Sequence, residues 1–233
     1  MSDPCPSLRP DSDLPATGGE AITVVTGLPR SGTSMMMQML VAGGYPALSD
    51  DRRPPDASNP QGYFEYEPVT RLHSQSGWIP QARGRGLKVV APLLRFLPLA
   101  GLDPAPLEYR VVFMRRDPVQ VVASQLRMLR NLGRGLDAPP SESVLIRAMQ
   151  QELESADRWV GRHAAAVLHV DYAATLKDPL TSALQLAVFL PGLDPLRSAA
   201  AVLGSRGGAG EKDPGMSEPA SSAAVAEATE FPR

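Results

Sequence analysis

A short β-branched run that leads directly into a glycine-rich turn limits most strongly how this chain can fold. Residues 22–26 consist of isoleucine, threonine and valine, and Gly27 and Gly32 bracket the turn that follows. Near-continuous runs of this kind are typical of parallel strands that are covered on both faces. Glycines let the backbone turn tightly, and the N–H groups at the start of a following helix attract an anion. The segment therefore predicts a buried strand, an anion-binding turn and a helix that begins near Thr33.

The spacing of Gly27 and Gly32 is that of the phosphate-binding P-loop, but Thr33 occupies the position of that motif's lysine. Kinases and nucleotide hydrolases of the P-loop type need this lysine against the β- and γ-phosphates, alongside a metal ion. Because Arg30 is the only cation in the turn, we expect a cradle for one phosphate group. A glycine-rich turn that binds nothing is the alternative interpretation. The residues predicted to form the cradle are Gly27, Leu28, Pro29, Arg30, Ser31, Gly32, Thr33 and Ser34.

Three further apolar runs, at residues 87–91, 110–114 and 167–170, predict additional buried strands. Between the last two, apolar residues recur every three or four positions from Ser141 to His163, which predicts a long amphipathic helix. Strands that alternate with helices indicate an α/β fold, here a P-loop-type, mostly parallel sheet flanked by helices. In such sheets, ligands bind beyond the carboxyl ends of the strands.

The ends of the chain differ in composition from its middle. The first 20 residues contain four prolines, and residues 204–233 are mainly Gly, Ala, Ser, Pro and Glu. Such segments bury too little apolar surface to offset the entropy of ordering them. We therefore expect one folded domain at residues 21–203, between a disordered arm at 1–20 and a disordered tail at 204–233.

Charge and hydropathy exclude several classes of protein. A net charge of −2 argues against a dedicated nucleic-acid binder, which usually carries a clear basic excess. No apolar run approaches the roughly 20 residues that span a bilayer, so we expect no stable membrane insertion. The N-terminal residues lack the apolar core of a secretory signal, and the single cysteine, Cys5, has no partner for an internal disulfide. These features predict a cytoplasmic protein.

A second candidate anion site follows the run at 110–114. Arg116 stands at the predicted strand end, Asp117 suits a helix N-cap and Pro118 suits a first helical turn. Ser124 follows two turns into that helix. We expect a guanidinium fork and a hydroxyl placed in this way to face one bound anion. Taken alone, the pattern favours a capped helix with a nearby arginine, because such helices are common.

Together, the two motifs resemble those of the sulfotransferase family. Residues 27–34 are similar to that family's 5′-phosphosulfate loop, in which a basic residue precedes Ser-Gly-Thr. Arg116 and Ser124 are similar to its 3′-phosphate site. Residues 59–65 and 170–190 also resemble family segments, so the likeness spans residues 22–190. The glycine-rich loop found later in many members has only a weak counterpart at residues 206–210.

The resemblance implies a sulfotransferase that moves a sulfuryl group from 3′-phosphoadenylyl sulfate to a hydroxyl or amine, without a metal ion. Adenosine 3′,5′-bisphosphate would be the leaving group. Arg30 is the first candidate cation at the reacting group, and Lys88 is a second, with an exposed strand-end lysine as the alternative interpretation. The acceptor is expected to be a small molecule, a lipid or a carbohydrate, and the sequence specifies neither its identity nor the oligomeric state.

Such an acceptor needs a general base, for which residues 62–78 supply three candidates. Glu65 is the first choice, because it lies in a segment similar to the family, and Glu67 and His73 remain alternatives. The aromatic residues of the same stretch predict an apolar acceptor pocket, although they equally suit a core. Two other functions stay open: a P-loop kinase or nucleotide hydrolase, and a non-catalytic nucleotide-binding module with the same fold.

Overall fold

The computed structural model describes residues 21–50, 52, 62–99, 106–131, 133 and 140–207. Within these ranges, five strands form one sheet in the order β2-β3-β1-β4-β5, and every neighbouring pair is parallel. The strands are β1 (Ile22–Gly27), β2 (Ala47–Leu48), β3 (Gly86–Lys88), β4 (Tyr109–Arg115) and β5 (Ala166–Asp171). The predicted α/β class with a parallel sheet is therefore confirmed.

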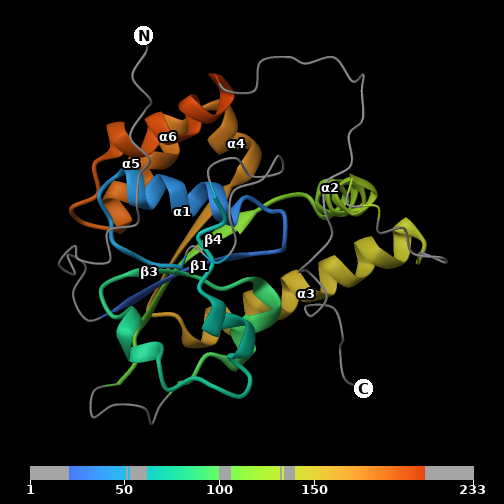
Figure 1. The fold of residues 1–233 in the computed structure, drawn as a ribbon, viewed down its shortest axis with the longest axis horizontal. Coiled ribbons are helices and arrows are strands. Elements are labelled where there is room, and N and C mark those ends of the chain that lie inside the picture. The colour runs from blue at the N-terminus through green and yellow to red at the C-terminus, as the bar shows by residue number, and fades with distance from the viewer. Residues whose placement is uncertain are drawn as a thin grey trace.

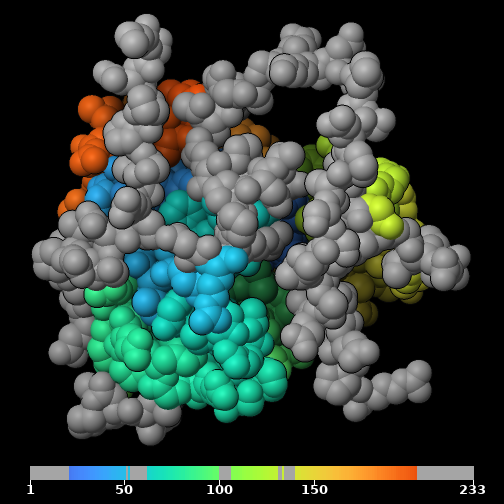
Figure 2. All heavy atoms as spheres, viewed as in Figure 1, coloured from blue at the N-terminus to red at the C-terminus, as the bar shows by residue number. Residues whose placement is uncertain are grey.

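Helices cover both faces of the sheet (Figure 1). Side chains of successive strand residues point to opposite faces. On one face, Val25 belongs to a core shared with α1 (Thr33–Ala42), α5 (Pro179–Phe189) and α6 (Pro195–Gly207). On the other, Ile22 and Val24 pack in a second core with α3 (Glu142–His163) and the 3₁₀ helices η1 (Glu67–Arg71), η2 (Ile79–Ala82) and η3 (Ala91–Phe96). The segment from residue 62 to residue 99 forms one continuous surface in the lower part of Figure 2.

The strand order reverses between β1 and β4. The chain leaves β1 through α1 towards β2 and β3 on one side, whereas β4 leads through α2 (Pro118–Asn131) and α3 to β5 on the other. Ligands of open parallel sheets bind at such a reversal of strand order. Gly27 pairs with Met114 in the β1–β4 register, so the turns after both strands begin side by side.

Most predicted elements occur with small shifts in their bounds. The strand predicted at 87–91 ends at Lys88, because η3 begins at Ala91 and Pro92 has no N–H to donate to a ladder. The long helix predicted from Ser141 begins at Glu142. Of its predicted apolar stripe, Ala156 and Val160 are fully buried, whereas the first two turns extend past the edge of the sheet (Figure 1).

The predicted limits of the domain stay a prediction. Residues 1–20, with Cys5, and residues 208–233 lie outside the described residues, and α6 continues to Gly207, past the boundary expected after Leu203. Most of the weak glycine-rich counterpart at 206–210 is outside them as well. Of the helices in the described ranges, none has both the length and the hydropathy that a bilayer-spanning segment requires.

Candidate functional site

The turn after β1 is built from left-handed backbone conformations. Gly27 has φ 148°, Arg30 has φ 70° and Gly32 has φ 97°. The N–H of Ser31 donates to the carbonyl of Leu28 at 3.0 Å, and α1 begins directly after Gly32. A left-handed non-glycine residue costs about 1–3 kcal/mol and persists only where the surroundings enforce it. The predicted strand, turn and helix are therefore present, with Arg30 held in a strained conformation at the tip.

Both glycines of the turn are closely packed. A Cβ atom at Gly27 would lie 2.7 Å from the carbonyl oxygen of Met114 on β4, and one at Gly32 would collide with the ring of Tyr172. Tyr172 is the first residue of α4 (Tyr172–Lys177), directly after β5. The two glycines thus let the turn lie close to the end of β4 and to Tyr172, which follows β5.

Gly32→Ala is expected to lower the free energy of unfolding by about 2–5 kcal/mol. The left-handed backbone costs an alanine about 1–2 kcal/mol, and the collision with Tyr172 adds about 1–3 kcal/mol. Gly44 is the matched control, since it has φ 84° but nothing within 4 Å of an added Cβ. In urea denaturation, the free energy of unfolding of Gly44→Ala should therefore fall only by the cost of the left-handed backbone. Equal losses in the two variants would show that Tyr172 does not press on the turn.

The two predicted anion sites contact each other. Arg116 Nη1 donates to the carbonyl oxygen of Arg30 at 2.8 Å, and Arg30 Nε donates to the Ser124 hydroxyl at 3.4 Å. Asp117 accepts from the N–H of Val119 at 2.8 Å, which stabilises the first turn of α2. Residues far apart in the sequence therefore form one cationic region at the carboxyl ends of β1 and β4.

Tyr172 contacts both of these parts, and no motif in the sequence pointed to it. The Arg116 guanidinium lies over its ring, 4.3 Å from the centroid, while the same ring packs against Gly32. A cation over an aromatic face is stabilised by about 0.5–2 kcal/mol. Tyr172 directly follows β5, the strand predicted at 167–170, and this position at a strand end is the feature of the sequence that could have identified it.

Lys88 occupies the other side of the turn. It is the last residue of β3, pairs in register with Val25 and is only 8% exposed, so it is not the exposed strand-end lysine of the alternative interpretation. Its Nζ donates to the Ser34 hydroxyl at 3.0 Å and to the carbonyl of Tyr63 at 2.9 Å. A buried ammonium requires such partners.

Glu65 completes this cluster. Its Oε1 lies 3.3 Å from Lys88 Nζ, and its side chain is 40% exposed. The segment is held on both sides by Asp50, whose N–H donates to the Glu65 carbonyl at 2.7 Å and whose carboxylate accepts from the Glu67 N–H at 2.6 Å. Phe64 has φ 50°, a strained conformation next to the cluster. The backbone thus holds Glu65 beside the turn at residues 27–34.

The two alternative bases have other partners. The Glu67 carboxylate accepts from Arg71 at 2.6 Å and lies 3.4 Å from Arg52. The exposed His73 packs edge-on against Phe96, with 6.0 Å between ring centroids. Of the three candidates, Glu65 is the one whose carboxylate contacts Lys88. Residues 59–61 of the similar segment lie outside the described residues.

The remaining residues predicted for the turn have structural surroundings. Leu28 is buried in the core that also holds η2 and η3, and Thr33 is buried at the start of α1. Ser31 is 1% exposed. Pro29 is partly exposed at the tip. Among the described residues, no three His, Cys, Asp or Glu side chains form a group that could hold a metal ion.

A second polar cluster stabilises the end of β4. Arg115 donates to Asp157 of α3 at 2.9 Å and to His169 Nδ1 at 3.2 Å. Burial, followed by the charge of Arg115, lowers the pKa of His169, and Asp157 partly opposes this effect. A neutral His169 retains the lone pair that accepts from Arg115. These contacts fix β4, β5 and α3 relative to one another just before Arg116.

Comparisons with known proteins give a likeness of fold. No protein-family model matches the sequence, and no curated protein matches it either. The sulfotransferase STF9 from Mycobacterium avium superposes with a TM-score of 0.51 and 14% identity, over 86% of this chain and 70% of that one. This chain has a sulfotransferase-like fold.

Two further sulfotransferase domains are more distant. The one from the olefin synthase of Synechococcus PCC 7002 has a TM-score of 0.42 and 15% identity, over 76% of this chain and 74% of its own. The one from the curacin biosynthetic pathway has a TM-score of 0.37 and 15% identity, over 79% and 83%. Neither of these two adds to the STF9 superposition, which alone confirms the predicted sulfotransferase resemblance at the level of the fold.

Proposed function

We propose that this chain is a sulfotransferase that uses 3′-phosphoadenylyl sulfate as donor. The observation that supports it is the direct contact of the Arg30 turn with Arg116 and Ser124 at the carboxyl ends of β1 and β4. A bisphosphorylated adenosine carries anionic groups at two ends. Two adjacent cationic sites at the carboxyl ends of the inner strands β1 and β4 suit a ligand with two separate anionic groups better than a nucleotide with a single phosphate chain.

Unpartnered buried polar atoms support the fit. Ser31 Oγ and Arg116 Nε are both buried and have no hydrogen-bond partner among the described residues. Leaving such groups unpaired costs about 1–3 kcal/mol each, more for a charged group. Anionic oxygens would accept from both. Residues 27–34 would hold the 5′-phosphosulfate, and Arg116 with Ser124 would hold the 3′-phosphate.

When bound, the donor supplies an activated sulfuryl group. Arg30, the turn's N–H groups and Lys88 stabilise the negative charge that grows on the oxygen between sulfur and the 5′-phosphate. Lys88 acts directly or through the Ser34 hydroxyl, to which it donates. As the acceptor oxygen or nitrogen bonds to sulfur, the bond to that bridging oxygen breaks and adenosine 3′,5′-bisphosphate leaves.

Glu65 is the proposed general base that takes the acceptor's proton. Its carboxylate is partly exposed and adjoins the buried ammonium that stabilises the leaving side of the reaction. Glu67 is a weaker candidate because the partners of its carboxylate, Arg71 and Arg52, lie outside the Lys88 cluster. The acceptor is proposed to be a small molecule, a lipid or a carbohydrate, and the composition favours a cytoplasmic setting.

Donor binding provides the test. Calorimetry should show that adenosine 3′,5′-bisphosphate binds more tightly than AMP or ATP with magnesium. Arg116→Ala should lower the affinity for the bisphosphate about 10²-fold, because two charge-assisted hydrogen bonds contribute roughly 3 kcal/mol together. Arg130→Ala, an exposed arginine on α2, is the matched control and should bind as the parent does.

The competing functions give different results in the same experiment. Tighter binding of ATP with magnesium would favour a nucleotide kinase or hydrolase and contradict the proposal. Tight bisphosphate binding without transfer of labelled sulfate to any component of a cell extract would identify a non-catalytic module. Transfer of label that is lost in Arg116→Ala would support a sulfotransferase, and the labelled product would reveal the acceptor.

A further inference from the structure

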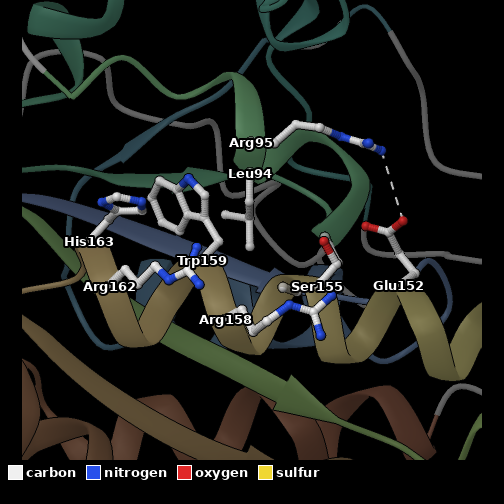
Figure 3. Close-up of a pocket in the computed structure, with 10 residues that line it drawn as sticks. Leu94, Arg95, Glu152, Ser155, Arg158, Trp159, Arg162 and His163 are labelled. Atoms are coloured by element: carbon white, nitrogen blue, oxygen red, sulfur yellow. Dashed lines mark ion pairs between the residues drawn. The ribbon is translucent and has the colours of Figure 1, made fainter.

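A cavity of about 160 Å³ lies between η3 and α3 (Figure 3). Leu94 from η3 and the indole of Trp159 from α3 form its apolar side, with Trp159 between Leu94 and His163 in the view. The Trp159 and His163 rings are 5.3 Å apart between centroids. The lining includes no residue of the turn at residues 27–34, the Arg116–Ser124 turn or the Lys88 cluster. It is therefore separate from the proposed donor site.

The rim of this cavity is cationic in a chain whose net charge is −2. Arg95 pairs with Glu152 across the opening at 3.9 Å, as the dashed line in Figure 3 marks. Arg158 lies 4.0 Å from Glu154. Arg162 has no ion-pair partner among the described residues. The opening thus carries one guanidinium whose charge the described residues do not compensate.

We propose that this cavity binds a small organic anion with a single flat ring, either an aryl carboxylate or an aryl sulfate. An engineered cavity of about 150 Å³ holds benzene, so this volume suits one ring. The ring would lie against Trp159 and Leu94, on the apolar side of a cavity whose remaining lining is largely polar and charged. Its oxyanion would accept the paired N–H groups of Arg162, whose planar fork matches a carboxylate or sulfate.

Arg162 and His163 also lie in the last turn of α3, where cations stabilise the exposed carbonyl groups. That role requires no ligand and would appear only as a change in stability. The readout must therefore report on the cavity itself. The chain has two tryptophans, so Trp78→Phe leaves the indole N–H resonance of Trp159 as a single reporter.

Benzoate is the probe, with benzamide as its neutral isostere and acetate as the anion without a ring. In proton–nitrogen NMR spectra of the full chain, benzoate should move the Trp159 indole resonance to saturation. Benzamide and acetate should each bind at least roughly tenfold more weakly, because benzamide lacks the negative charge and acetate lacks the ring. Arg162→Gln should lower the affinity for benzoate by a similar factor. Arg197 is an exposed arginine on α6, and Arg197→Gln should leave this affinity unchanged.

Three results would overturn the proposal: no saturable shift with benzoate, an equal shift with acetate, or undiminished benzoate binding in Arg162→Gln. Phenyl sulfate in place of benzoate distinguishes the two anionic groups. None of these measurements uses the sulfuryl donor. Failure of this inference would leave the proposed function untouched, and the reverse also holds.

Discussion

Replacing Glu65 with glutamine is expected to lower the rate of sulfuryl transfer by a factor on the order of 10²–10⁴, the usual contribution of a general base. Glutamine keeps the shape of the side chain and still accepts from Lys88 at its carbonyl oxygen, but it takes no proton. Transfer of labelled sulfate to the acceptor identified in an extract measures the rate. Calorimetry with adenosine 3′,5′-bisphosphate should show unchanged donor binding.

Glu67→Gln is the matched control for this prediction. The Glu67 carboxylate is held by Arg71 at 2.6 Å, so its loss should change transfer by no more than a few-fold. A Glu65→Gln protein that transfers sulfate at the parental rate would rule out Glu65 as the base. If Glu67→Gln or His73→Gln were the slow variant instead, the base would be that residue.

Replacing Lys88 with methionine has the second-largest expected effect, a loss of transfer on the order of 10²–10³-fold. The ammonium is 8% exposed and donates to the Ser34 hydroxyl, so it adds positive charge at the turn where the leaving group develops negative charge. Methionine fills a similar volume, but it leaves the Tyr63 carbonyl and the Glu65 carboxylate without the ammonium, and removing one partner of a buried ion pair costs about 3–5 kcal/mol. Thermal unfolding should therefore show a loss of stability, and transfer must be measured at a temperature where the variant is still folded.

Lys177→Met, an exposed lysine at the end of α4, is the control and should retain parental transfer. The double variant Glu65→Gln/Lys88→Met separates two roles of Lys88. If Lys88 acts mainly by holding Glu65, the double variant should be no slower than the slower single variant. If Lys88 stabilises the leaving group on its own, the two losses should multiply. Parental transfer by Lys88→Met would contradict both roles.

The sequence predicted those parts of the fold that depend on local pattern. The run at 22–26, the glycine spacing and the apolar runs at 110–114 and 167–170 each determine their own conformation, and each occurs nearly as expected. The 3₁₀ helices were not predicted, since single turns have no apolar period. Pro68, Pro80 and Pro92 each stand in the first turn of one of them, a start signal that was available.

The candidate site could be predicted residue by residue, but not its contacts. Arg30 and Arg116 were identified from separate motifs, and their contact follows from the β1–β4 pairing, which no local pattern encodes. The burial of Lys88 likewise depends on the segment of Tyr63 and Glu65, which folds over β3 from a distant part of the chain. Tyr172 was missed because its partners lie on two other strand ends.

The hydrogen bond from Arg116 to the Arg30 carbonyl has a consequence for selectivity among cellular nucleotides. Each cationic site helps to position the other, so an anion bound at one site orders the second. Both sites are filled only by a ligand whose two anionic groups have the matching separation. A nucleotide with phosphates only on its 5′ carbon would leave the buried Nε of Arg116 without an anionic acceptor. Under the proposed function, abundant ATP and AMP would therefore compete poorly with a scarce bisphosphorylated donor.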